Sequence, residues 1–213
     1  MTTPSSSGVS SGADAQAQRR AVVVAGYVGD TQVVRQAMGH DDPRVRASAL
    51  AALHRIGSLS DDTLRSTFSD PSAIVRRRAA SLSINYPQVS PRALLVDEDD
   101  TVVEVAVWAY GERVEADHAV VAKLCEMGKG HANPLVREAA VAALGAIGHP
   151  DGLGTILAAT NDRIAVRRRA VLALAPFEGP EVTVALQRAL TDKDWQTREA
   201  AELLTQSSVT LSK

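Results

Sequence analysis

Residues 42–53 read Asp-Pro-Arg-Val-Arg-Ala-Ser-Ala-Leu-Ala-Ala-Leu, and stretches of the same kind recur along the chain. The clear copies begin at an aspartate or asparagine and continue through valine and arginine into a run rich in alanine and leucine. The clear further copies are residues 70–82, 133–144 and 162–174, and the weaker ones are residues 99–108 and 194–204. Internal repetition with a period of 20 to 50 residues, roughly, indicates an array of stacked supersecondary units.

Aligning the six copies produces columns of similar residues. One column holds Arg46, Arg76, Glu104, Arg137, Arg167 and Arg198, with steps of 30, 28, 33, 30 and 31 residues. The column three residues later holds Ala49, Ala79, Val107, Ala140, Ala170 and Ala201. A small residue at one repeated position allows a neighbouring helix to approach closely, so we expect this column to lie in the packed interior.

Each copy has the periodicity and boundaries of a helix. In the first copy the apolar residues Val45, Ala49, Ala52, Leu53 and Ile56 share one helical face. Asp or Asn followed by Pro is typical of a helix start, and Gly57 and Gly148 are placed as C-terminal caps. Aromatic residues make up only 3% of the chain, while alanine and leucine favour helix.

Shorter apolar segments separate the copies, and we interpret each as the outer helix of a pair. They are residues 31–38, 61–68, 90–96, 115–127, 151–159 and 180–190. Residues 14–28 predict an additional inner helix with no partner before it. The sequence therefore predicts an all-α array of about six helix pairs plus an N-terminal helix.

The stretch Asp-Pro-x-Val-Arg-x-x-Ala-x-x-Ala-Leu, with Gly after Ile56 and Ile147, resembles the short HEAT-like repeats first associated with phycobilisome lyases. The resemblance covers about residues 14–205 and implies a right-handed α-α superhelix, the HEAT-like solenoid. It also implies that each column arginine pairs with an aspartate of the preceding turn. The partners would be Asp42, Asp70, Asp162 and either Asp192 or Asp194. Glu104 interrupts the column, which predicts different stacking or a different charge partner in the third repeat.

Composition suggests how the chain is organised outside the repeats. We expect a flexible tail at residues 1–13, rich in Ser and Gly, a repeat domain at residues 14–206, and fraying at residues 207–213. No segment approaches about 20 consecutive apolar residues, and the N-terminus has no basic start or apolar core. With a single cysteine and a formal net charge of −2, we expect a cytoplasmic protein that does not bind membranes.

No pattern of residues in the sequence predicts catalysis. The histidines, His40, His54, His118, His131 and His149, form neither His-Glu pairs nor His-x-x-x-His, and we expect surface or capping roles. Cys125 is expected to be structural, and the acidic residues 97–100 to form a solvated turn at a helix start. Phosphate-binding glycine loops and Gly-x-Ser-x-Gly elbows are absent. We therefore expect no enzyme, and no catalytic, cofactor or metal site.

Two arginine triplets, residues 76–78 and 167–169, are the strongest functional signal. The first arginine of each can join the column, whereas helical geometry directs the other two to solvent. The candidate partner-binding residues are Arg77, Arg78, Arg168, Arg169 and the tryptophan at a helix start, Trp195. Trp108 aligns with a buried apolar column, and we expect it in the core.

These observations favour a non-catalytic scaffold or adaptor that binds another protein on the concave face lined by second helices. The alternative that the arginines merely solvate a helix face stays open. Two further alternatives are nucleic-acid binding, as in HEAT-like DNA glycosylases, and a bilin lyase-like activity. The acidic sequence between the triplets argues against a continuous phosphate-binding stripe. We expect a monomer because Glu202 makes the last copy polar where earlier copies are apolar.

Overall fold

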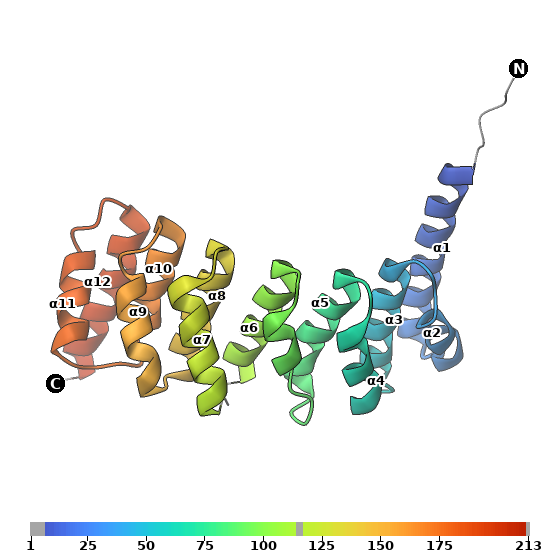
Figure 1. Ribbon diagram of the computed structural model, residues 1–213, viewed down its shortest axis with the longest axis horizontal. Helices are drawn as coiled ribbons and strands as arrows, with labels where there is room; N and C mark the ends of the chain where they lie inside the picture. The colour runs from blue at the N-terminus through green and yellow to red at the C-terminus, as the bar shows by residue number, and fades with distance from the viewer. Residues whose placement is uncertain (1–6, 114–116, 212–213) are drawn as a thin grey trace, which may run out of the picture. The chain divides into compact units, whose positions relative to one another are not determined.

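The computed structural model describes residues 7–113 and 117–211, and every regular element in those ranges is a helix (Figure 1). Pairs of antiparallel helices follow one another along the chain (Figure 1), and short 3-10 turns lie among them. The predicted all-α class is confirmed, because the described elements form a series of helix pairs. None of these described helices is long and apolar enough to span a lipid bilayer.

The elements follow the predicted order of one unpaired helix and six pairs. The unpaired helix is α1 (Ser7–Val28). The first pair consists of α2 (Thr31–Ala37) and α3 (Pro43–Ile56). In the second pair, α4 (Asp61–Ser66) and the 3-10 turn η1 (Thr67–Ser69) precede α5 (Ala73–Leu82). After η2 (Ser83–Asn85), η3 (Arg92–Val96) precedes α6 (Asp100–Arg113), and α7 (His118–Gly130) precedes α8 (Pro134–Ile147). The last pairs are η4 (Pro150–Gly152) and α9 (Leu153–Ala159) with α10 (Ile164–Ala173), and α11 (Pro180–Ala189) with α12 (Trp195–Leu211).

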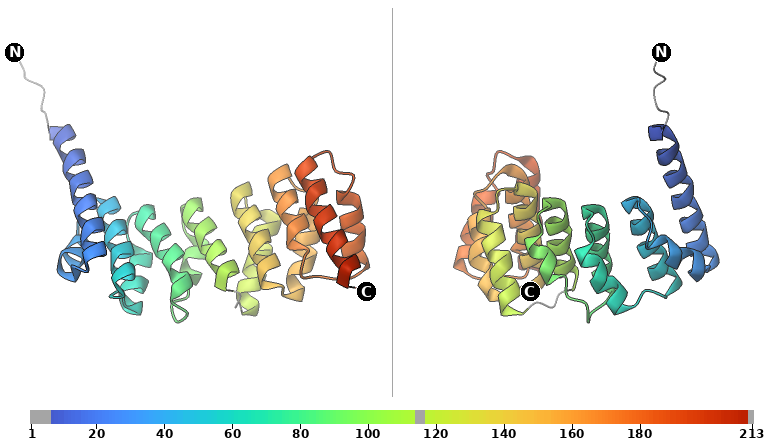
Figure 2. Two further views of the ribbon diagram at one scale, coloured as in Figure 1. Left: turned by 180° about the vertical axis from the view of Figure 1, so that it is seen from behind. Right: turned by 45° about the vertical axis from the view of Figure 1, so that its right-hand side comes forward.

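The chain forms two compact units, Met1–Val102 and Val103–Lys213, whose boundary lies inside α6. In the first unit, α1 packs on α3 and α3 packs on α5. In the second unit, α8 packs on α10 and α10 packs on α12, so their second helices lie side by side (Figure 2). The single repeat domain at residues 14–206 stays a prediction, because the chain divides into two compact units.

The ends of the chain are more helical than expected. Helix α1 begins at Ser7, so residues 7–13 are helical although the sequence assigned them to a tail. Val22 and Ala25 anchor α1 in the core, and each residue added to an anchored helix gains a backbone hydrogen bond. Helix α12 likewise continues to Leu211, through most of the segment expected to fray. Residues 1–6 and 212–213 lie outside the described residues.

Caps close α3 and α8 where the sequence placed them. The Asp42 carboxylate accepts a hydrogen bond from the backbone N–H of Arg44 at 2.7 Å, and the Asn133 side chain does the same for Leu135 at 2.9 Å. Gly57 ends α3 with a φ of 75°, a left-handed conformation that glycine adopts without steric cost.

The caps also correct the alignment of the third repeat. The Asp99 carboxylate accepts the backbone N–H of Thr101 at 2.8 Å. Asp42 and Asn133 likewise accept the N–H of the residue two positions later. Because Arg46 follows its cap by four residues, the equivalent residue after Asp99 is Val103, and the placement of Glu104 in the column is wrong. The corrected alanine column holds Ala49, Ala79, Ala106, Ala140, Ala170 and Ala201, and all are buried.

Four arginines of the column each connect the turn before their own helix with the turn inside the next helix pair. We call each of these arginines, together with its aspartate partner, an arginine latch. Arg137 donates through Nε and Nη2 to both carboxylate oxygens of Asp162, at 2.8 Å each, and through Nη1 to the His131 carbonyl at 2.8 Å. The other latches are Arg46 with Asp70, Arg76 with Asp97, and Arg167 with Asp192.

The latches overturn the pairing that the family resemblance implied. Each carboxylate belongs to the turn inside the next helix pair, just before that pair's second helix, whereas the turn before the arginine's own helix supplies only backbone carbonyls. Asp42 is an N-cap and pairs with no column arginine, and Asp70 pairs with Arg46 instead of Arg76. The arginine side chain is long enough to contact both turns, and a bidentate carboxylate matches the fork of the guanidinium.

Candidate functional site

A row of large apolar side chains is exposed on the second helices of the second unit. Trp108 on α6, Leu135 on α8, Leu172 on α10 and Leu203 on α12 are 45%, 54%, 42% and 57% exposed. The expectation that Trp108 packs in the core is wrong, because the corrected alignment places Val107 in the buried column and turns Trp108 outward. Neighbouring apolar side chains in solvent are typical of a binding surface.

Trp108 lies in a depression between α6 and α8 with a volume of about 680 Å³. The depression forms because many side chains on the facing helices are small, and glutamates lie along its border. The lining residues are Glu104, Val105, Trp108, Gly111, Glu112, Leu135, Glu138, Ala139, Ala142, Ala143, Ala146 and Arg169. Volumes of about 300–1,000 Å³ are usual for ligand-binding clefts.

A second depression, of about 370 Å³, lies over α8, α10 and α12. Its lining includes Leu172, Leu203 and Glu199, and it shares Glu138 and Arg169 with the first depression. Arg169 Nη2 lies 3.5 Å from Glu138 Oε1, so this ion pair forms part of the wall of both. We call the two depressions together the second-helix groove.

A close approach of backbones shapes the groove. Gly111 on α6 has no side chain, and a Cβ there would lie 3.0 Å from Ala143 Cα on α8. Gly145 on α8 occupies the equivalent position, where a Cβ would lie 2.7 Å from Ala173 Cα on α10. Glycine therefore lets consecutive second helices pack closely, while the larger residues of the same helices stand at the surface.

The predicted arginines lie in both units. Arg77 and Arg78 on α5 are exposed, and neither forms an ion pair with another described residue. Arg168 donates to both carboxylate oxygens of Asp194 at 2.6 and 2.7 Å, and this bidentate contact is the largest cause that lowers the pKa of Asp194. Arg169 pairs with Glu138. A partner-binding role for these four arginines stays a prediction.

Trp195 is the first residue of α12 and is 59% exposed, but it does not line the second-helix groove. Its role in partner binding also stays a prediction. Sequence reasoning missed Trp108, Leu172 and Leu203 as surface residues. The signal was present, because the three residues share one repeat position once Val103 is aligned with the arginine column.

Three of the five histidines accept backbone hydrogen bonds in turns. Nδ1 of His40, His131 and His149 accepts the backbone N–H of the residue two positions later, at 2.9 to 3.2 Å, which confirms the predicted capping role. The acidic segment is less solvated than expected, because Asp97 binds Arg76 and Asp99 caps α6.

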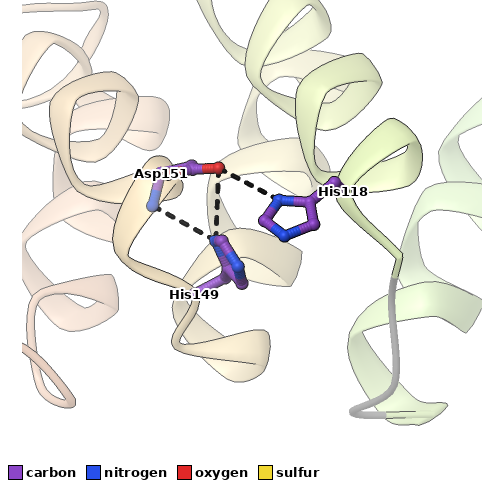
Figure 3. Close-up of side chains that lie close together, drawn as sticks. All are labelled: His118, His149 and Asp151. Carbon is purple, nitrogen blue, oxygen red and sulfur yellow. Dashed lines mark hydrogen bonds and ion pairs between the residues drawn. The ribbon is translucent and has the colours of Figure 1, made fainter.

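Only one cluster of His, Cys, Asp and Glu side chains among the described residues has the composition to hold a metal ion. It comprises His118, His149 and Asp151, whose ligand atoms lie within 4.8 Å of one another (Figure 3). The sequence did not predict this cluster, because its histidines lie 31 residues apart.

The chain was compared with known proteins. A sequence model described as HEAT repeats matches residues 7–85 and 121–205, and no curated protein matches the chain in sequence. A designed armadillo repeat protein superposes with a TM-score of 0.56 at 16% identity, covering 80% of this chain and 96% of that one. The Escherichia coli protein YibA gives a TM-score of 0.57 at 16% identity, covering 94% of this chain and 75% of that one. The matched segments make up more than half of the sequence, and the chain belongs to the HEAT repeat family.

Proposed function

We propose that the protein is a non-catalytic scaffold that binds a segment of another protein in the second-helix groove. The observation that carries this proposal is the exposed row of Trp108, Leu135, Leu172 and Leu203 on consecutive second helices. Tryptophan in particular supplies a large, rigid contact surface and is enriched among the residues that dominate binding energy. A segment with apolar side chains at matching intervals would remove this row from water.

The charges around the groove favour a basic partner segment. Glu104, Glu112 and Glu138 line the depression between α6 and α8, and the arginine that lines it, Arg169, is paired with Glu138. Lysine or arginine on the partner would complement Glu104 and Glu112, which form no ion pair within the described part of the chain. The same carboxylates would repel the phosphates of a nucleic acid, which argues against that alternative.

Affinity capture with groove variants tests the proposal. The full chain and the variant Trp108→Ala/Leu135→Ala would be used to capture binding proteins from cell extract. Val184→Ala is the matched control, because Val184 is 63% exposed on α11 outside the groove. We expect the double variant to lose a stoichiometric partner that the parent chain and the control retain. Equal capture by all three proteins would contradict the proposal that the partner binds in the second-helix groove.

Charge reversal then separates the groove from the arginine surfaces. Glu104→Lys/Glu112→Lys should abolish capture of a basic segment, whereas Arg77→Glu/Arg78→Glu should leave it intact. Loss of capture only in the arginine variant would move the binding surface to α5. Salt-sensitive binding of a DNA duplex at about 50 mM salt would favour the nucleic-acid alternative.

A further inference from the structure

The cluster of His118, His149 and Asp151 is separate from the second-helix groove, since none of its residues lines that groove. His118 is the first residue of α7, and the other two lie in the turn that leads into α9. The histidines are one repeat period apart in sequence, and α7 packs directly against η4. Stacking of successive first helices therefore brings together three side chains that the sequence separates.

The donor atoms have separations suited to a small metal ion. His118 Nδ1 lies 3.4 Å from Asp151 Oδ2, and His149 Nδ1 lies 3.6 Å from the same oxygen (Figure 3). A tetrahedral zinc ion with bonds of about 2.0–2.1 Å to nitrogen and oxygen holds its ligands roughly 3.3 Å apart. Small side-chain rotations within the cluster would therefore be enough to place one ion among the three groups.

The orientation of the rings supports the same interpretation. The two imidazoles meet edge to face, with centroids 4.8 Å apart and an interplanar angle of 83°. Both Nδ1 atoms lie within 3.6 Å of the same Asp151 carboxylate oxygen. His149 Nδ1 accepts the N–H of Asp151 at 3.2 Å, so this nitrogen is unprotonated, and a metal ion bound there would replace this hydrogen bond. Metal binding requires an unprotonated nitrogen of this kind.

The cluster is open to solvent. The side chains of His118 and Asp151 are 82% and 62% exposed, and that of His149 is 28% exposed. An ion could therefore bind without displacing the packed core, and water could complete its coordination.

We propose that His118, His149 and Asp151 form a binding site for a divalent transition-metal ion of the zinc class. Three protein ligands and one water would complete a tetrahedral shell, for which imidazole and carboxylate are suitable ligands. The ion would tie the start of α7 to the turn before α9 and so stabilise the second unit. Binding to the folded chain alone raises its stability by mass action.

The test uses the full chain in a Cys125→Ser background. Cys125 is the only cysteine, and its Sγ lies 3.5 Å from the Asp151 carbonyl oxygen, so its thiol could bind metal by itself. Zinc affinity would be measured by calorimetry and by competition with a chromogenic chelator, and cobalt would report coordination geometry through its visible absorption. We expect one ion per chain and the intense absorption of tetrahedral cobalt.

Single substitutions assign the ligands. His118→Ala, His149→Ala and Asp151→Asn should each weaken zinc binding by more than about tenfold, since even loss of an outer-shell partner commonly costs that much. His131→Ala is the matched control and should bind normally, because His131 also caps a turn of the same unit but lies outside the cluster. Zinc should raise the unfolding temperature of the parent chain and the control, but not of the three ligand variants.

Three results would overturn the metal site. They are absence of zinc binding in the Cys125→Ser background, retention of full affinity in the ligand variants, and equal loss of affinity in the His131 control. Circular dichroism of each variant would show that the helices are intact. Failure of this site would leave the second-helix groove untouched, since the two share no residue.

Discussion

The repeats built on α8 and α6 begin alike and then differ at one position. Each has a side-chain N-cap and a buried valine three residues later, Val136 in α8 and Val102 in α6. The next residue is Arg137 in α8, which forms a latch to Asp162, but Val103 in α6, which is buried and carries no charge. The boundary between the two compact units falls between Val102 and Val103, within the repeat that lacks the arginine.

The comparison shows that the repeat has separable parts. The valine and alanine positions build the helix pair in both cases, because both sets are buried. The arginine position joins consecutive turns and can be lost without loss of the helix. The outward positions vary most, since Trp108 in α6 corresponds to Ala142 in α8, and large beside small residues create the depression between the helices.

The largest expected effect comes from filling the close approach of α8 and α10. Gly145→Val should lower the free energy of unfolding by about 3 kcal/mol, because the new side chain would overlap the Ala173 backbone. The equivalent Gly111→Val in α6 should cost less, about 1.5 kcal/mol, since its nearest backbone atom is further away. Urea denaturation of both variants measures the difference.

Gly154→Ala is the control for these two glycines, because a Cβ at Gly154 meets no atom within 4 Å. That variant should be as stable as the parent or slightly more stable, since alanine favours helix. If Gly111→Val proved the more damaging of the two valine variants, the tighter packing of α8 on α10 would be wrong.

Removal of a latch should have the next largest effect. Arg137→Leu should cost about 2 kcal/mol, because it leaves the partly buried Asp162 without its partner. Arg198→Leu should cost about half as much, since Arg198 donates to the carbonyls of Asp192 and Lys193 and leaves no carboxylate unpaired. Chemical denaturation of the two variants, with Asp162→Asn to complete a double-mutant cycle, checks the ranking.

Acid should weaken the latches in a defined direction. The hydrogen bonds from Arg137 and Arg167 are the largest causes that lower the pKa of Asp162 and Asp192 below the ordinary value of 3.8. A lowered pKa in the folded state stabilises the fold above the ordinary pKa, and this contribution is lost as the pH falls through the folded-state value. Between about pH 5 and about pH 3, Arg137→Leu should therefore lose less stability than the parent chain. Urea denaturation of both proteins across this pH range measures the two losses of stability. A larger loss in Arg137→Leu than in the parent chain would contradict the prediction.

The smallest effect on stability is expected at Trp108. Trp108→Ala should lower the free energy of unfolding by less than about 1 kcal/mol, because nearly half of Trp108 is exposed. Tyr110→Ala, two residues further along α6, should cost about 3 kcal/mol because Tyr110 is 4% exposed. Thermal unfolding of this pair distinguishes a groove residue from a core residue on the same helix, and a large loss at Trp108 would contradict the proposed surface.

Much of the fold follows from local patterns. The helix starts at Asp42 and Asn133 and the glycine caps at Gly57 and Gly148 were predictable, because these residues act within one turn of the chain. The third repeat was misaligned by one residue because its copy lacks both proline and arginine. A shift of one residue rotates a helical position by about 100°, enough to move Trp108 from the surface into the expected core.

The sequence by itself determined the helical repeat, its period of about thirty residues, the capped ends of its helices and the buried valine and alanine faces, because periodicity and capping are properties of neighbouring residues. The tertiary structure alone decided which turn each arginine faces, where the groove opens, and that His118 meets His149. These contacts join side chains about one repeat apart, and such residues meet only when consecutive helix pairs stack in a particular orientation.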